Sequence, residues 1–476
     1  MADARPAAGA ARAAAGNAAR PCAPSADATR RAIEAVWRIE AARIIAAVAR
    51  LVRDVGLAEE FAQDALVAAL ESWSAPAADA RPSAATTPAA ASARAAAAAP
   101  SGLPANPAAW LMTAARNRAL DHLRAAALHA RRQAELGADA DALGSHLAPD
   151  PADLLDAARA DDIGDDLLRL IFTASHPLLG TEARVALVLR LLGGLSTAEI
   201  ARAFLAPEPT IAQRIVRAKK TLAAARPAFE LPPPAERAAR LASVLEVIYL
   251  VFNEGYSATA GDDWMRPALC DEALRLGRVL AGLMPAEPEV HGLVALMEIQ
   301  ASRTAARTDT AGRPVLLLDQ DRARWDRLLI HRGLAALARA EALGGADGSY
   351  ALQAAIAACH ARAARATDTD WPRIAALYAR LARVAPGPVV ALNRAVAVGM
   401  AEGPAAGLAL ADALAADPAL ARYHWLPSVR ADLLAKLGRH AEARAEFERA
   451  ATLTRNAVEQ ALLRERAAAL GAAIKP

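Results

Sequence analysis

The sequence predicts an all-α protein, and its composition is the main reason. The chain of 476 residues is rich in Ala, Leu and Arg, and only 4% of its residues are aromatic. These abundant residues favour helix. No segment shows the alternation of apolar and polar residues that a half-buried strand requires. Since a chain of this length suggests about three domains, we expect two small helical domains followed by a long α-helical extension.

Charge, cysteine spacing and hydropathy exclude several classes of protein. The net charge is only +3, so any nucleic-acid surface must be local. Cys22, Cys270 and Cys359 stand far apart, which argues against a zinc site or a disulfide framework. No apolar run approaches the roughly 20 residues that span a bilayer. The Arg-containing N-terminus lacks the apolar core of a signal peptide. These features predict a cytoplasmic protein with no membrane partner.

A helix-turn-helix is predicted over Leu195–Leu222, which reads LSTAEIARAFLAPEPTIAQRIVRAKKTL. Ser196 and Glu199 form an S-x-x-E capping box that starts the first helix. Pro207 and Pro209 end that helix and open the next, because proline is tolerated in a first helical turn. Residues at helical spacing give each helix an inward side: Ala198, Ala201 and Phe204 in the first, and Ile211, Ile215, Ala218 and Leu222 in the second.

The second of these helices also carries a basic, polar stripe that is typical of a recognition helix. Long side-chain donors on one face can reach base edges and phosphates. An ordinary amphipathic hairpin can show the same pattern with a basic face that is merely solvated, so the segment alone leaves both interpretations open. The candidate residues are Thr210, Gln213, Arg214, Arg217 and Thr221, with Lys219 and Lys220 at the flanks.

A longer helix is predicted to begin with Asn106 as N-cap and Pro107 at the first helical position. One of its stripes combines an aromatic side chain, an amide and arginine. This combination suits single-stranded nucleic acid, because bases stack and phosphates need cations. The alternative is a solvated polar face with the aromatic side chain partly buried. The stripe holds Trp110, Thr113, Asn117, Asp121 and Arg124, opposite an inward side of Leu111, Met112, Ala115, Ala119 and Leu123.

The helix before it, AEEFAQDALVAALESW, has an acidic start at Glu59 and Glu60, followed by Asp64 and Glu71. Its apolar side consists of Phe61, Ala65, Leu66, Ala69 and Leu70. Acids near a helix N-terminus can simply stabilise the helix dipole. The alternative is a docking surface for a large protein partner.

Low-complexity stretches divide the chain. We expect a disordered tail over 1–28, a helical domain over 29–133 with an Ala/Pro insert at 74–101, and a linker over 134–160. A second helical domain over 161–228 ends at the stiff Pro-rich joint Leu231–Glu236. From 236 to 476 helix follows helix, and small residues near the end match tetratricopeptide-like repeats. These are Ala441, Ala443, Ala450 and Ala451, with Phe447 as a larger packing residue.

Taken in order, the three helical segments resemble bacterial extracytoplasmic-function (ECF) RNA polymerase sigma factors. The acidic segment looks like the region 2 helix that docks on the polymerase clamp, the Asn106 segment like the helix that engages the −10 element, and the helix-turn-helix like region 4, which reads −35. The resemblance covers about Thr29 to Ala228 apart from the insert.

The resemblance implies a role for individual residues. It places Glu59, Glu60, Gln63 and Asp64 on the polymerase-binding surface. It places Asn117, Arg118, Asp121 and Arg124, together with the stacking candidate Trp110, on the −10 helix. It places Thr210, Gln213, Arg214 and Arg217, flanked by Lys219 and Lys220, on the −35 helix.

The chain beyond Glu236 is similar to the ECF subgroup that carries a large helical extension with tetratricopeptide-like repeats. This similarity implies that the extension modulates sigma activity through an unknown regulator or ligand. A dedicated membrane anti-sigma factor is not the arrangement it implies. The matching segments are Tyr249–Ala258, Cys270–Leu276, Leu316–Asp326, Leu352–Ala361 and Val389–Val398.

The residue pattern of the extension argues against a catalytic site or a metal site. A metal site could be built from Asp319, Asp321 and Asp326 with His331, joined by Asn253 and Glu254. The three aspartates do not all share one helical face, however, and the interleaved arginines favour internal ion pairs. Cys359 and His360 are adjacent, so they point to different sides of a helix and are expected to be core and surface residues. No P-loop, H-E-x-x-H or G-x-S-x-G pattern is present. We expect neither enzymatic activity nor a cofactor or metal.

The sequence therefore predicts a sigma factor that binds core RNA polymerase and promoter DNA. Two alternatives stay open: a helical-repeat adaptor whose helix-turn-helix is structural, and a conventional helix-turn-helix activator without sigma activity.

Overall fold

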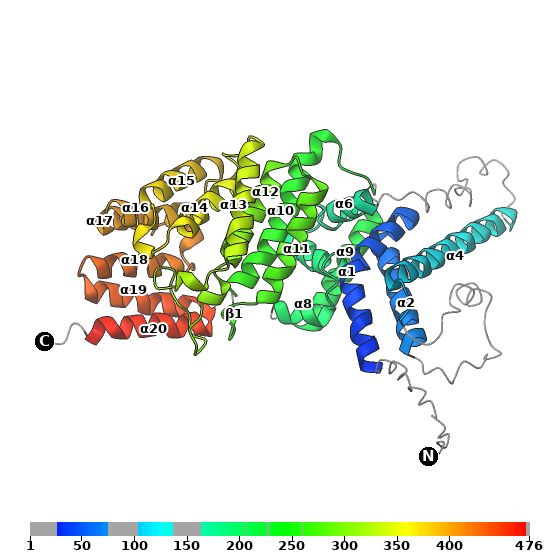
Figure 1. Ribbon diagram of the computed structural model, residues 1–476, viewed down its shortest axis with the longest axis horizontal. Coiled ribbons are helices and arrows are strands. Elements are labelled where there is room, and N and C mark those ends of the chain that lie inside the picture. Colours follow the sequence, from blue (N-terminus) through cyan, green and yellow to red (C-terminus); the bar gives the residue numbers. More distant parts are fainter. Residues whose placement is uncertain are drawn as a thin grey trace, which may run out of the picture.

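The computed structural model describes residues 26–74, 103–136, 163–204, 206–225, 227, 229–258 and 260–472. Nearly all of the expected tail and of the Ala/Pro insert, and most of the linker, lie outside these residues; residues 26–28 of the expected tail are helical, because α1 (Ala26–Val52) begins there. The all-α prediction is confirmed (Figure 1). In the described part of the chain, strands are limited to β1 (Ala260–Gly261) and β2 (Arg455–Asn456), which pair in parallel. None of the described helices combines the length and apolar character needed to cross a bilayer.

Three helices form the N-terminal unit: α1 (Ala26–Val52), α2 (Val55–Ser74) and α4 (Pro107–Leu136). As predicted, Asn106 caps α4, its Oδ1 accepting from the Ala109 N–H at 3.0 Å. Alanines at helical spacing line the buried side of α2, and their small side chains let α1 and α4 approach closely. These buried residues are Ala58, Ala62, Ala65 and Ala69 on α2, facing Leu111, Ala115 and Ala119 on α4.

The next unit contains α6 (Ile163–Ala174), α7 (Thr181–Leu191), α8 (Thr197–Ala203) and α9 (Glu208–Ala225). The capping box is formed in both directions: Ser196 accepts from the Glu199 N–H, and the Glu199 carboxylate accepts from the Ser196 N–H. The four predicted inward residues of α9 are all buried. Ile200, which the sequence pattern did not single out, is the fully buried residue of α8.

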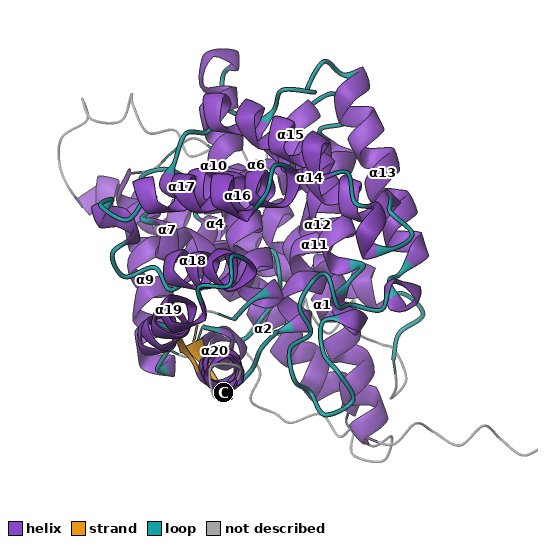
Figure 2. Ribbon diagram, turned by 90° about the vertical axis from the view of Figure 1, so that its left-hand side faces the viewer, coloured by secondary structure: helices purple, strands orange, loops and turns teal. Residues whose placement is uncertain are grey.

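The C-terminal extension is a stack of helices in which neighbours along the chain pack on one another (Figures 1 and 2). Proline occupies the first position of five of them, α10, α11, α12, α16 and α17, where its missing N–H costs no hydrogen bond. The first helices are α10 (Pro234–Tyr256), α11 (Pro267–Leu283), α12 (Pro288–Ala301), α13 (Arg327–Ala342), α14 (Ser349–Arg362) and α15 (Trp371–Val384). Then follow α16 (Pro388–Ala401), α17 (Pro404–Ala413), α18 (Trp425–Lys436), α19 (His440–Leu453) and α20 (Ala457–Ala472). Short 3-10 turns lie at Thr304–Ala306, Arg322–Arg324, Ala366–Asp368 and Pro418–Leu420.

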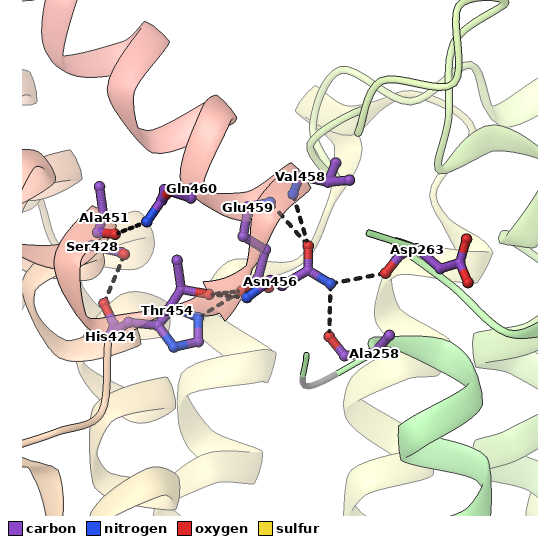
Figure 3. A network of polar contacts seen from close by, with 10 residues as sticks. All are labelled: Ala258, Asp263, His424, Ser428, Ala451, Thr454, Asn456, Val458, Glu459 and Gln460. Atoms are coloured by element: carbon purple, nitrogen blue, oxygen red, sulfur yellow. Dashed lines mark hydrogen bonds and ion pairs between the residues drawn. The ribbon is translucent and has the colours of Figure 1, made fainter. Parts of the chain in front are cut away.

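The end of this stack is tied back to its beginning through Asn456 (Figure 3). The fully buried Asn456 amide donates to the carbonyl oxygens of Ala258 and Asp263, at 3.1 and 2.8 Å. Its Oδ1 accepts from the Val458 and Glu459 N–H groups at the start of α20. One side chain therefore caps α20 and joins segments almost two hundred residues apart.

Two expectations for the extension are wrong. The acids of Leu316–Asp326 do not form ion pairs with the interleaved arginines. Asp321 instead caps the 3-10 turn Arg322–Arg324, and Asp326 caps α13, each by accepting from backbone N–H groups. Arg322 donates to the carbonyls of His360 and Ala363 at 2.5 and 2.7 Å. Cys359 and His360 are both buried, because α14 is covered by neighbouring helices on more than one side.

The extension is continuous with the unit that carries the helix-turn-helix. A single apolar core runs from α1 through α7 and α9 to α12. At the boundary, an arginine of α10, the arginine that precedes α11 and an arginine of α11 donate to carbonyl oxygens at the C-terminal ends of three helices, where no intrahelical partner remains. The pairs are Arg240 with Phe172 at 3.2 Å, Arg266 with Ala203 at 2.6 Å, and Arg275 with Leu192 at 2.5 Å.

Candidate nucleic-acid interface

The outward face of α9 holds four of the six predicted −35 residues around one shallow hollow. The hollow has a volume of about 300 Å³, and Thr210, Gln213, Arg214 and Arg217 line it together with the Leu178–Gly180 loop. On the other side of the helix, Ile211, Ile215 and Leu222 are buried and pack α9 against its neighbours. The helix thus presents donors on one side and packing residues on the other, as a recognition helix requires.

The basic residues of α9 differ in how accessible they are to a ligand. Arg217 and Lys220 are exposed. Arg214 is held by Glu182 at the start of α7, with 2.5 Å between Nη2 and Oε2, and the Glu182 side chain remains largely exposed. Because exposed ion pairs are weak, a phosphate can displace Glu182 at small cost. Lys219 is turned the other way, toward α2.

The predicted −10 helix is only partly exposed. Trp110 packs edge to face on Trp73 of α2, with ring centroids 5.1 Å apart. Asn117 is half-buried. Asp121 and Arg124 pair with each other along the helix at 3.1 Å. Arg118 reaches Asp64 of α2 at 2.7 Å, so a predicted −10 residue and a predicted polymerase contact neutralise each other.

Glu59 has an environment that the sequence did not indicate. Its side chain is buried, with a residue exposure of only 3%, and lies between α2, α7 and α9. Arg190 Nε lies 2.6 Å from Glu59 Oε1, and Lys219 forms a second ion pair with the same carboxylate. Gln63 donates to it at 2.6 Å. Of the predicted polymerase contacts, Glu60 and Asp64 remain exposed.

The helix dipole does not explain Glu59. α2 begins at Val55, so Glu59 lies beyond its first turn. The free N–H groups of that turn are satisfied by Asp54, whose Oδ1 accepts from Gly56 and Leu57 at 2.7 and 3.0 Å. What holds Glu59 is the pair of cations from the helix-turn-helix unit. Arg190 also donates to the Leu195 carbonyl at 3.1 Å, which ties it to the loop before α8. No local pattern marks Arg190, because its partner is more than a hundred residues away.

Metal-ligand chemistry has no visible basis in the residues that the structure describes. No group of three or more His, Cys, Asp or Glu side chains among them could hold a metal ion. Cys270 and Cys359 are buried free thiols, and burial raises the pKa of the Cys270 thiol to about 12. A thiol with such a pKa is a poor nucleophile.

Comparison with known proteins identifies two parts of this arrangement. Residues 171–222 match the family model of sigma-70 region 4. Residues 240–341, which begin the extension, match a family of unknown function, DUF6596. An uncharacterized protein of Rhizobium meliloti (strain 1021) is 43% identical over 418 residues, which is 88% of this chain and 91% of that protein. No solved structure matches the chain. The chain therefore belongs to the same family as this Rhizobium protein, and it has the sigma-70 region 4 domain and the helical extension of an ECF-type sigma factor.

Proposed function

We propose that the protein binds core RNA polymerase and directs promoter-specific initiation, with α9 reading the −35 duplex and α4 holding the −10 strand. The observation that carries this proposal is the hollow on α9, where Thr210, Gln213, Arg214 and Arg217 converge. In the helix-turn-helix, this face enters the major groove while the first helix crosses the backbone. The chemistry is binding, so no bond-breaking step is assigned to the chain.

The polymerase-binding surface is proposed on the exposed side of α2. Glu60 and Asp64 lie one turn apart there and present carboxylates to solvent. Charged residues at such a rim steer association and select the partner. A partnership with polymerase and promoter DNA also implies that the protein works in the cytoplasm. The extension then modulates this activity through its tight contact with α7.

A change of arrangement is part of the proposal. Glu59 and Lys219, predicted to contact polymerase and DNA respectively, are paired with each other. Neither can meet its partner while this contact holds. We infer that α2 and α9 separate before Glu59 contacts polymerase and Lys219 contacts DNA. Residues 137–162 connect the two units after this separation.

Reconstituted transcription tests the proposal. The full chain is mixed with core polymerase and a library of promoter fragments, and the start sites of the transcripts are mapped. A sigma factor initiates at a defined promoter class without any other sigma. A conventional activator initiates only after a housekeeping sigma is added, and an adaptor changes neither result. Initiation by core polymerase at the same sites without this chain would also refute the proposal.

A further inference from the structure

Four segments of the extension have no assigned role, yet they meet around one cavity. They are Tyr249–Ala258, Leu316–Asp326, Leu352–Ala361 and Val389–Val398. Each contributes to the lining of a partly open hollow of about 440 Å³ among α10, α12, α14, α15 and α16. This volume lies in the range of small-molecule sites. The cavity is distinct from the DNA-facing hollow on α9 and shares no residue with it.

The walls of the cavity combine flat apolar surfaces with a few polar groups. Tyr249, Tyr256 and Tyr378 supply aromatic rings. The Tyr256 ring is stacked on Phe252, with centroids 5.7 Å apart, and the Tyr249 hydroxyl donates to the Gln353 side chain at 3.2 Å. The rings are therefore held in place before any ligand arrives, which reduces the entropy lost on binding.

A cationic group lies in this wall without a carboxylate partner. Arg303 lines the cavity, and its Nη2 donates to the Tyr256 hydroxyl at 2.5 Å and to the Gln300 side chain. Both acceptors are neutral. Behind it, Arg307 and Arg322 donate to backbone carbonyls. In the described part of the chain, none of these three arginines lies within ion-pair distance of a carboxylate; Glu459 and Asp368 act on Arg307 and Arg322 only from farther away. A cluster of like charges with neutral partners attracts an anion.

His360 supplies an independent sign of a missing partner. The residue is 8% exposed, lines the cavity and packs edge to face on Trp371. Its Nδ1 is buried and has no hydrogen-bond partner. Burial, followed by the charges of Arg303 and Arg322, lowers the pKa of His360 to about 4, so its imidazole is neutral at physiological pH. A buried polar atom of this kind in a cavity wall is normally satisfied.

We propose that this cavity binds a small organic anion, in which a carboxylate, sulfonate or phosphate group meets Arg303 and a flat apolar body lies between the tyrosine rings. The guanidinium keeps donors beyond those used by Tyr256 and Gln300, and such a donor fork suits an oxyanion. His360 Nδ1 then contacts a polar group of the ligand. The opening faces solvent at Val389, which is 42% exposed.

A matched pair of fluorescent probes tests the site in the full-length chain. Anilinonaphthalene sulfonate carries a sulfonate on an aromatic body, and phenylnaphthylamine has the same body without the anion. We expect saturable binding of the sulfonate at one site per chain, and weaker binding of the neutral probe. Arg303→Met keeps the length of the side chain and removes its charge, so it should weaken binding of the sulfonate roughly tenfold or more. Arg383→Met, an exposed arginine outside the cavity, is the matched control and should leave binding unchanged.

A second variant keeps the test decisive if Arg303→Met fails to fold, which circular dichroism will show. Val389→Trp places a large ring at the exposed mouth and leaves the charges intact, so it should abolish binding of the sulfonate. Equal affinity for the two probes, or unchanged binding of the sulfonate in both variants, would overturn the proposal. The experiment needs neither polymerase nor DNA, so its outcome is separate from that of the transcription assay.

Discussion

Arg190 of α7 and Glu59 of α2 form a buried ion pair, with 2.6 Å between Nε and Oε1. It joins the unit proposed to bind polymerase to the unit that carries the helix-turn-helix. The Glu59 carboxylate also takes Lys219 of α9, so the desolvation of one buried acid is offset by two cations. If either cation is removed, the desolvation of the Glu59 carboxylate is offset by one cation instead of two. The contact therefore holds the two units in one arrangement. The separation of Glu59 from Arg190 and Lys219 is the step to test.

A disulfide between α2 and α9 is expected to block initiation by preventing that opening. A Cβ at position 56 would lie 3.8 Å from the Lys219 Cβ, which is the separation of a normal disulfide. The pair Gly56→Cys and Lys219→Cys, in a Cys22→Ser background, should be inactive in the transcription assay when oxidised and recover when reduced. Comparing the two redox forms of one variant cancels the loss of the lysine itself. Equal output from both forms would show that the units need not separate.

Arg217→Ala should weaken binding to −35 DNA by about 1–3 kcal/mol if the exposed guanidinium reaches a base edge. Fluorescence anisotropy with duplexes that carry single base changes gives the measurement. A base contact predicts that the loss is concentrated at one base pair. A loss that is the same for every duplex would make Arg217 a phosphate contact. Arg202→Ala, an exposed arginine on α8, serves as the comparison.

Asp64→Lys should reduce association with core polymerase, because it reverses a charge on the exposed side of α2 and also places a lysine beside Arg118. The two partners are about half exposed, so the pair itself contributes only about 0–1 kcal/mol to stability. Asp64→Asn removes the charge without introducing repulsion and should have an intermediate effect. Co-purification with polymerase, at unchanged helicity, is the readout. Full retention of Asp64→Lys by polymerase would remove this residue from the docking surface.

The stability of the extension should fall as the pH is lowered from about 6.5 to about 4. His360 has a folded-state pKa of about 4 against an ordinary value of 6.5, so the unfolded chain binds the proton first. The destabilisation is absent above the unfolded pKa and complete below the folded one, with a size on the order of 3 kcal/mol. Urea midpoints of the wild type and His360→Phe, measured across this range, provide the test. If the two profiles run parallel, His360 is not the group that titrates.

Truncation after Leu231 is expected to destabilise the helix-turn-helix unit as well as remove the extension. Leu241, Val244, Leu245 and Ile248 of α10 share one core with α7 and α9. Each such side chain contributes about 1.5–3 kcal/mol when fully buried. A lower melting temperature for the remaining helices, followed by circular dichroism, checks this. Removal of α20 alone leaves that core intact, so it should lower the melting temperature of these helices less than the truncation does. A truncated chain as stable as the full one would contradict the shared core.

Local patterns predicted the parts of the fold that depend on neighbouring residues. The Ser196–Glu199 capping box, the Asn106 cap and the buried stripe Ile211, Ile215 and Ala218 are all present. In each case, the residue and its partner lie within a few positions on one helix. A helical period or a cap is sufficient to identify such pairs.

The sequence by itself therefore determined the helices, their caps and the polar face of α9. Only the tertiary structure decided that Glu59 is buried against Arg190 and Lys219, and that four distant segments of the extension enclose one cavity. The physical reason is that burial and ion pairing depend on which helices pack together. That packing is determined by the burial of apolar surface from segments far apart in the sequence, so the spacing of residues within one segment does not predict it.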